Sequence, residues 1–167
     1  MSLVIIGMGQ IYRRDDAVGV IAVQAWQQAF PKTAENPFLR VEICPLPGLN
    51  LLELLEGADQ AVIVDAIQSG AAPGTIHAIG KNDLASLPAG SGSAHGWGIA
   101  ECLILADQGG LAHVPGTLHI LGIEIETVEL GQNLSTIVND ALLELVARLQ
   151  NHVEAIVQDL ETNRGIS

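Results

Sequence analysis

The pattern of the first 30 residues limits the fold more than any other part of this sequence. An apolar run at residues 3–7 ends in a turn with two glycines, Gly7 and Gly9, and apolar residues then recur at helical spacing over residues 16–30. This pattern predicts a buried strand that leads directly into a helix. Strands and helices continue to alternate along the chain, which favours an α/β sandwich with a mostly parallel sheet.

The turn between this strand and helix carries two adjacent acids, Asp15 and Asp16. A glycine-rich turn before a helix is typical of phosphate sites, because free backbone N–H groups at a helix start attract anions. Here the two carboxylates would repel a phosphate, and Tyr12 occupies the place of the third glycine in a dinucleotide-binding fingerprint. We therefore expect the turn to face a cation or a cationic partner, with Asp15 as the N-cap of the helix.

The rest of the chain continues the alternation without internal repeats or low-complexity tracts. Residues 61–64 are all apolar, as expected of a central strand buried on both faces, and Asp65 ends that run. Glycine and proline crowd residues 80–98 and predict a long loop, and loops of this length are often functional. Further strands are expected at 38–44, 75–79 and 116–122, and helices at 49–56, 82–85, 98–106 and 135–160.

Length, charge and composition narrow the classes of protein and partner. A chain of 167 residues fits one domain, expected at residues 1–161 with a frayed tail at 162–167. Nineteen acidic and seven basic side chains give a net charge of −12, which disfavours nucleic acid and anionic membrane surfaces as partners. No signal peptide is visible, and no stretch reaches the ~20 apolar residues of a membrane span. A monomeric cytoplasmic protein is expected.

Cysteine and serine give little support for a nucleophilic mechanism. Cys44 and Cys102 do not form a CxxC pair, and both are expected to be buried, reduced thiols. Cys44 stands at a strand end, but Pro45 follows it, and no helix begins there that would activate the thiol. The sequence also lacks the Gly-x-Ser-x-Gly elbow of serine hydrolases. Carboxylates and histidines are therefore the better candidates for chemistry.

Three of these side chains are predicted to meet at the carboxyl edge of the sheet, where open α/β sheets bind ligands. Asp16 follows the first strand, Asp65 ends the apolar strand, and the glycine-rich loop can bring His95 over the same edge. Two carboxylates and an imidazole suit zinc, nickel or a similar divalent ion with one position left open. In the alternative, the acids serve a helix dipole and a turn, and the histidine is solvated. The remaining histidines are assigned structural roles: His77, His113, His119 and His152.

Four short segments resemble, in order and spacing, the motifs of the hydrogenase maturation endopeptidases, which process the large subunit of nickel–iron hydrogenases. The match covers nearly the whole chain. Its segments are Gly7-Met8-Gly9-Gln10 with Asp15-Asp16-Ala17-Val18-Gly19, Val64-Asp65-Ala66, Ser93-Ala94-His95-Gly96-Trp97-Gly98, and Gly122-Ile123-Glu124.

The resemblance implies a three-layer α/β/α fold with a five-stranded sheet in the order 2-1-3-5-4, strand 4 being antiparallel. It also implies that Asp16, Asp65 and His95 occupy the metal-binding positions of the family. The implied function is removal of a C-terminal extension from a hydrogenase large-subunit precursor after nickel insertion. The nickel would be supplied by the substrate, and zinc or another divalent ion can take its place. Arg13 and Arg14 are candidates for pairing with acidic or terminal groups of that substrate, or are solvated.

Three segments depart from the family pattern. Gln10 stands where the family usually has Asn, and residues 43–48 replace its usual Asp-Gly-Gly-Thr-x-Gly run, with only Gly48 matching. The proline common after the last strand is missing from Glu124-Ile125-Glu126. Because the loop at 43–48 should border the cleft, two other functions stay open: a small-molecule metal-dependent hydrolase, or a non-catalytic binding module of the same fold.

Overall fold

A computed structural model describes residues 2–45, 49–86, 99–110 and 113–164. Its five strands form one sheet in the order β2-β1-β3-β5-β4. Neighbouring strands are parallel except β4, which runs antiparallel to β5. This is the order and polarity implied by the family resemblance. The strands are β1 (Leu3–Met8), β2 (Leu39–Cys44), β3 (Gln60–Ile67), β4 (Ile76–Gly80) and β5 (Thr117–Glu124).

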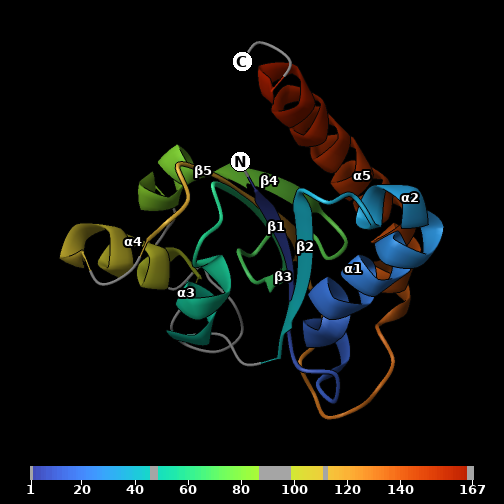
Figure 1. The fold of residues 1–167 in the computed structure, drawn as a ribbon. Helices are drawn as coiled ribbons and strands as arrows, with labels where there is room; N and C mark the ends of the chain where they lie inside the picture. Colours follow the sequence, from blue (N-terminus) through green and yellow to red (C-terminus); the bar gives the residue numbers. More distant parts are fainter. Residues whose placement is uncertain (1, 46–48, 87–98, 111–112, 165–167) are drawn as a thin grey trace.

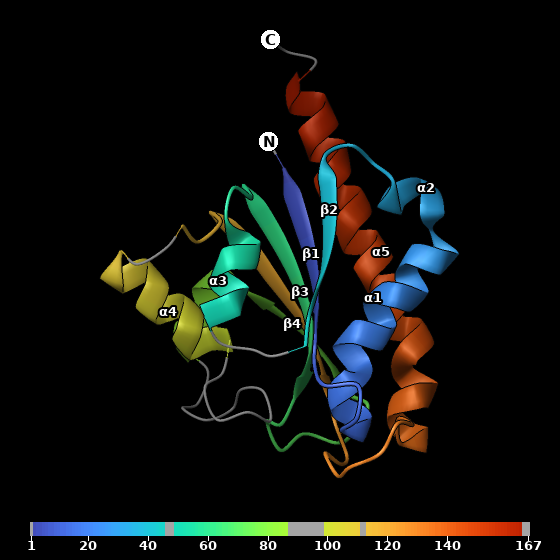
Figure 2. The same ribbon diagram turned by 60° about the horizontal axis from the view of Figure 1, so that its bottom comes forward.

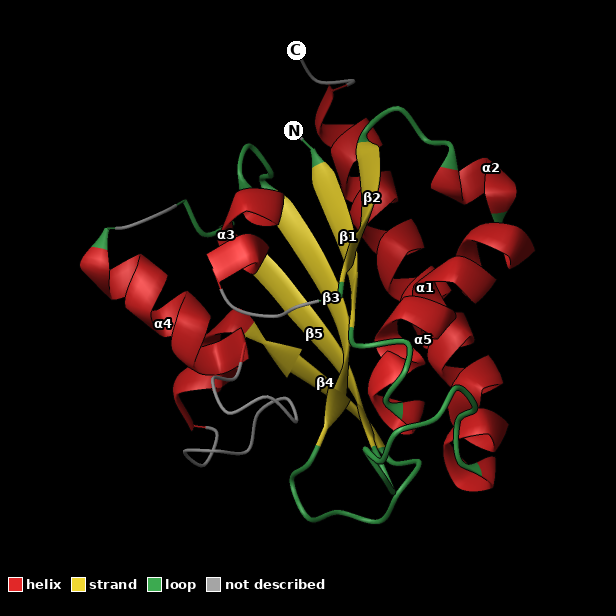
Figure 3. Cartoon of the chain, turned by 90° about the horizontal axis from the view of Figure 1, so that it is seen from below, coloured by secondary structure: helices red, strands yellow, loops and turns green. Residues whose placement is uncertain are grey.

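Helices cover both faces of the sheet and make three layers (Figures 1 and 3). One face carries α1 (Val18–Ala29), the short α2 (Pro31–Ala34) and α5 (Thr136–Arg164), and the other carries α3 (Leu49–Leu55) and α4 (Ile99–Gly109). Two 3₁₀ turns, η1 (Arg14–Ala17) and η2 (Lys81–Ser86), precede α1 and follow β4. No helix within the described residues is long and apolar enough to cross a membrane.

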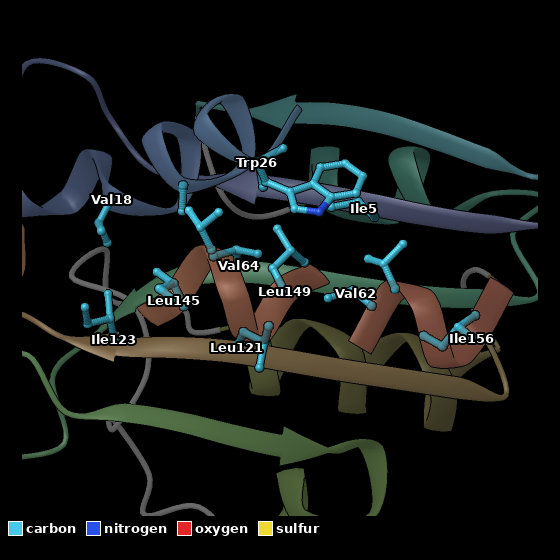
Figure 4. Packing of buried hydrophobic residues seen from close by; sticks show 14 of the residues in the cluster. Ile5, Val18, Trp26, Val62, Val64, Leu121, Ile123, Leu145, Leu149 and Ile156 are labelled. Carbon is cyan, nitrogen blue, oxygen red and sulfur yellow. The ribbon is translucent and has the colours of Figure 1, made fainter. Parts of the chain in front are cut away.

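Each face of the central strands has its own apolar core, because successive side chains in a strand point to opposite sides. Towards α1 and α5, strand residues such as Ile5 and Val64 pack with Trp26 and Leu149 (Figure 4). Trp26 is fully buried, and its indole N–H donates to the Gln150 amide oxygen at 2.7 Å. The other core packs the alternate strand residues, among them Val4, Ile6, Ile63 and Cys44, against Leu51 of α3 and Cys102 and Leu103 of α4.

Three differences between the observed element boundaries and the sequence-based expectation bear on the site and on the end of the chain. The helix expected from residue 16 begins as the 3₁₀ turn η1 and becomes α-helical only at Val18. The strand expected at 61–64 continues to Ile67, so Asp65 lies inside β3 and pairs with Gly122 of β5 rather than ending the strand. The last helix continues to Arg164 through part of the tail expected to fray, and residues 165–167 lie outside the described part of the chain.

Candidate active site at the carboxyl edge of the sheet

Glycines allow η1 and the start of α1 to lie directly on the strand ends. Gly9 has a φ of +128°, and a Cβ there would lie 1.7 Å from the carbonyl oxygen of Asp16. A Cβ on Gly19 would lie 2.2 Å from the Val64 carbonyl oxygen and 2.4 Å from that of Met8. Only glycine fits such contacts, because both neighbours are backbone atoms that cannot move aside. Gly9 and Gly19 therefore allow the close backbone contacts that place Asp16 at the ends of β1 and β3.

Asp16 is fully buried at this edge. The backbone N–H of Gln10 donates to its Oδ2 at 2.8 Å, so the turn that follows β1 holds its own carboxylate in place. The donor is the main-chain N–H of Gln10, which any residue except proline would supply, and the Gln10 side chain takes no part in this hydrogen bond. The Gln10 departure therefore leaves this contact to Asp16 unchanged.

Asp65 lies beside this turn because β1 and β3 are neighbours. The last paired residues of the two strands are Gly7 and Val64, and Asp65 is the next residue of β3. Burial raises the pKa of Asp65 to about 8; the backbone N–H of Ala66 works against this rise, and the negative charge of Asp16 adds to it. The two carboxyl groups thus form an acid pair that opposes its own full ionisation. A cation bound between them would reverse that effect.

The third predicted ligand, His95, lies outside the described residues. Within the described ranges, no group of three or more His, Cys, Asp or Glu side chains is placed to hold a metal ion. The structure therefore supplies one part of the predicted ligand set, the acid pair of Asp16 and Asp65. Two carboxylates are hard oxygen donors that suit a divalent cation, and a third donor is needed to complete a typical site.

Asp15 does not cap the helix that follows it, so that prediction was wrong. Neither η1 nor α1 has a side-chain cap. The buried carboxylate of Asp15 instead reaches the start of α5, where Ser135 precedes the first helical turn and accepts from the N–H of Asn139. It accepts four hydrogen bonds there: from the N–H groups of Glu126 (3.0 Å), Thr127 (3.1 Å) and Ser135 (2.6 Å), and from the Ser135 hydroxyl (2.9 Å).

Further hydrogen bonds join the two loops that flank the acid pair, residues 10–14 and 125–135. The N–H of Gly131 donates to the Tyr12 carbonyl at 3.0 Å, and the N–H of Arg14 donates to the Gly131 carbonyl at 3.0 Å. The Arg13 guanidinium donates to the Val128 carbonyl at 3.2 Å, and Arg14 lies 3.9 Å from the exposed carboxylate of Glu129. These contacts join the two loops into one hydrogen-bonded unit. The loops lie at the same end of the molecule in Figures 1 and 2.

A buried glutamate to which the sequence analysis assigned no role holds the loop after β3. Glu124, the last residue of β5, accepts from the N–H and hydroxyl of Ser69, both at 2.8 Å, and from the N–H of Gly70 at 2.9 Å. His77 Nε2 lies 3.6 Å from its Oε2. His77 faces Gly122 across the antiparallel β4–β5 pair, a neighbour that spacing along the chain does not reveal. Only the register of β4 against β5 shows that His77 and Glu124 are neighbours.

The other histidines lie away from this edge. The ring of His119 on β5 lies 5.5 Å from that of His152 on α5, in an edge-on arrangement. Burial lowers the pKa of His119, and the neighbouring His152 lowers it further. The two histidines therefore contact each other between β5 and α5, and neither belongs to the acid pair.

Comparison with known proteins identifies the family to which this chain belongs. The sequence model described as HycI, hydrogenase maturation protease, matches residues 46–152. This chain belongs to the hydrogenase maturation protease family. It is accordingly a peptidase, and the alternatives of a small-molecule hydrolase and a binding module are not favoured. The matched span contains Asp65 and His95, whereas Asp16 lies before it.

Individual relatives agree with this family and with the fold. The hydrogenase 2 maturation protease of Escherichia coli (strain K12) is 27% identical over 165 residues, which cover 95% of this chain and 98% of that protein. The hydrogenase expression/formation protein HupD of Rhizobium leguminosarum bv. viciae is 28% identical over 73% of this chain and 58% of its own length. Among solved structures, the hydrogenase maturating endopeptidase HybD from E. coli superposes with a TM-score of 0.77 at 24% identity, covering 93% of each chain.

Proposed function

We propose that this protease removes the C-terminal extension of a nickel–iron hydrogenase large-subunit precursor after nickel has been inserted, and that Asp16, Asp65 and His95 contact that nickel. The metal is thus part of the substrate, and zinc or another divalent ion can stand in for it. The family and the names of the relatives support the hydrogenase precursor as the partner. The observation that carries the site is the acid pair, two buried carboxyl groups close enough for one charge to raise the pKa of the other.

The acid pair gives the protein a means to distinguish nickel-loaded from empty precursor. Without a cation, Asp65 keeps its proton at neutral pH, because burial and the charge of Asp16 disfavour a second carboxylate. A substrate that brings a divalent cation would let Asp65 ionise, so its binding should release about one proton at neutral pH. A precursor without metal would meet a partly neutral, desolvated pair and gain little from it.

The reaction itself is the hydrolysis of one peptide bond. A water oxygen adds to the scissile carbonyl carbon, the carbon–nitrogen bond breaks, and the departing nitrogen takes a proton to leave as an amine. In this proposal a carboxylate of the acid pair accepts the proton that the attacking water loses. A divalent ion at this position would polarise a carbonyl or lower the pKa of a bound water.

The test is processing of a nickel-loaded precursor by Asp16→Asn, Asp65→Asn and His95→Ala variants. Asp59→Asn is the matched control, because Asp59 precedes β3 at the opposite edge of the sheet and contacts Ser2 instead. We expect loss of cleavage in the three site variants and wild-type cleavage in the control. Near-normal cleavage by all three site variants would refute the site. Precursor binding without shortening by the wild type would favour a binding module, and hydrolysis of small esters with a tightly held metal would favour a small-molecule hydrolase.

A further inference from the structure

Three large apolar side chains are exposed on the two hydrogen-bonded loops beside the acid pair. Ile11 is 50% exposed, Tyr12 61% and Leu130 87%. Among the described residues, six large apolar side chains are exposed in all, so half of them lie on these two short loops. We call Ile11, Tyr12 and Leu130 the edge patch. Exposed apolar side chains that stand singly need no explanation, but a group on adjoining loops marks a candidate interaction surface.

The edge patch is continuous with the candidate active site. Ile11 follows Gln10, whose N–H holds the Asp16 carboxylate at 2.8 Å. Leu130 precedes Gly131, whose N–H donates to the Tyr12 carbonyl at 3.0 Å. Both loops lie at the same end of the molecule, below the carboxyl ends of the strands in Figures 1 and 2. A partner that places a group on Asp16 would therefore lie next to the loops that carry this patch.

The patch is also held in one shape before any partner binds. The Asp15 carboxylate fixes residues 126, 127 and 135 of one loop, and Arg14 and Gly131 join that loop to the other. Arg14 even adopts a left-handed φ of +47°, which is rare for a residue with a side chain. Because the backbone of both loops is already fixed, a partner that binds the patch does not pay the entropy cost of ordering it.

The rim of the patch carries both charges: Arg13 and Arg14 follow Tyr12, and the exposed carboxylate of Glu129, next to Leu130, lies 3.9 Å from Arg14. The two arginines are among the seven lysines and arginines of a chain whose net charge is −12. An apolar centre containing a tyrosine, with a polar and charged rim that includes arginine, is the composition of protein–protein interfaces. The overall negative charge works against an anionic membrane or nucleic acid at this surface.

We propose that the edge patch is the docking surface for the folded body of the hydrogenase large-subunit precursor, where Tyr12 and Leu130 bind the precursor next to the cleavage site. This inference rests on the proposed function and adds the surface that recognises the protein rather than its metal. Docking here holds the C-terminal extension against Asp16 and Asp65. Affinity for the precursor thus depends on side chains that do not touch the scissile bond.

The experiment compares Tyr12→Ser and Leu130→Ser with Leu143→Ser in the full chain. Leu143 is the matched control, because it is 81% exposed but lies within α5 rather than on the two loops. Processing of nickel-loaded precursor is measured for KM and kcat, and the dissociation constant is measured separately. We expect KM and the dissociation constant to rise roughly tenfold for each patch variant, as for an anchor side chain of an interface, with kcat nearly unchanged. Leu143→Ser should match the wild type.

Other outcomes overturn the inference in distinguishable ways. Patch variants that match Leu143→Ser, or that lose kcat at an unchanged KM, would show that the patch does not dock the precursor. A wild-type dimer that the patch variants disrupt without a change in KM would assign the surface to a second copy of this chain instead. If the wild type neither binds nor cleaves the precursor, the proposed function itself fails, and the docking inference fails with it.

Discussion

The buried acid pair predicts that replacing Asp65 by its neutral isostere stabilises the protein. Burial and the Asp16 charge raise the pKa of Asp65 from 3.8 to about 8, so at pH 7 folding requires a proton that the unfolded chain has lost. Holding that proton about three pH units above its ordinary pKa costs about 4 kcal/mol, at about 1.36 kcal/mol per unit. Asp65→Asn needs no proton, so it should raise the free energy of unfolding by up to this amount.

The same reasoning fixes the direction of the pH dependence. The folded state binds one more proton than the unfolded state between pH 3.8 and about 8. Wild-type stability should therefore fall as pH rises through this range, by up to about 1.4 kcal/mol per pH unit. Asp65→Asn should lose this part of the slope, whereas Asp59→Asn should keep it, because Asp59 lies at the other edge.

Urea denaturation at pH 5, 6 and 7 in a chelating buffer measures both effects. An Asp65→Asn protein that is less stable than the wild type at pH 7, or that keeps the full wild-type slope, would refute the reasoning. A stabilised variant that no longer processes precursor would show that the pair is retained for function at a cost in stability.

Two further predictions concern how the site is held. Asp15→Ala removes the acceptor of four hydrogen bonds and should lower the free energy of unfolding by about 2–5 kcal/mol, because it leaves buried donors unpaired; a loss under about 1 kcal/mol in urea denaturation would contradict the assigned role. Gly9→Ala should destabilise far more than Gly57→Ala, because both glycines have positive φ but only Gly9 would place a Cβ against backbone, 1.7 Å from the Asp16 carbonyl oxygen; equal melting temperatures for the two variants would count against the close approach.

The sequence predicted where Asp16 and Asp65 lie better than it predicted their surroundings. An all-apolar run at 61–64 indicated a central strand, and the structure confirms that β3 lies beside β1. The run could not show that β3 continues past Asp65 to Ile67, because a charged residue ordinarily marks a strand end. Here burial raises the pKa of the carboxyl group to about 8, which lowers the cost of placing it inside a strand at neutral pH.

Contacts between distant segments were beyond the reach of sequence patterns. Asp15 had the position of an N-cap for the next helix, but its partners lie 111 to 120 residues later. Glu124 and His77 meet only because β4 turns back along β5, and strand order and polarity came from the family resemblance rather than from periodicity. His95 remains a predicted ligand, since residues 87–98 are outside the described part of the chain.

The central claim is that Asp16 and Asp65 act as one electrostatic unit that accepts a divalent cation. The carboxyl ¹³C chemical shift of Asp65, followed by NMR from pH 4 to pH 9 with and without zinc, tests it most directly. We expect a midpoint at about 8 without metal, a lower midpoint in Asp16→Asn, and an ionised carboxylate at neutral pH once zinc is added. A midpoint at the ordinary value of 3.8 that neither zinc nor Asp16→Asn changes would contradict the account.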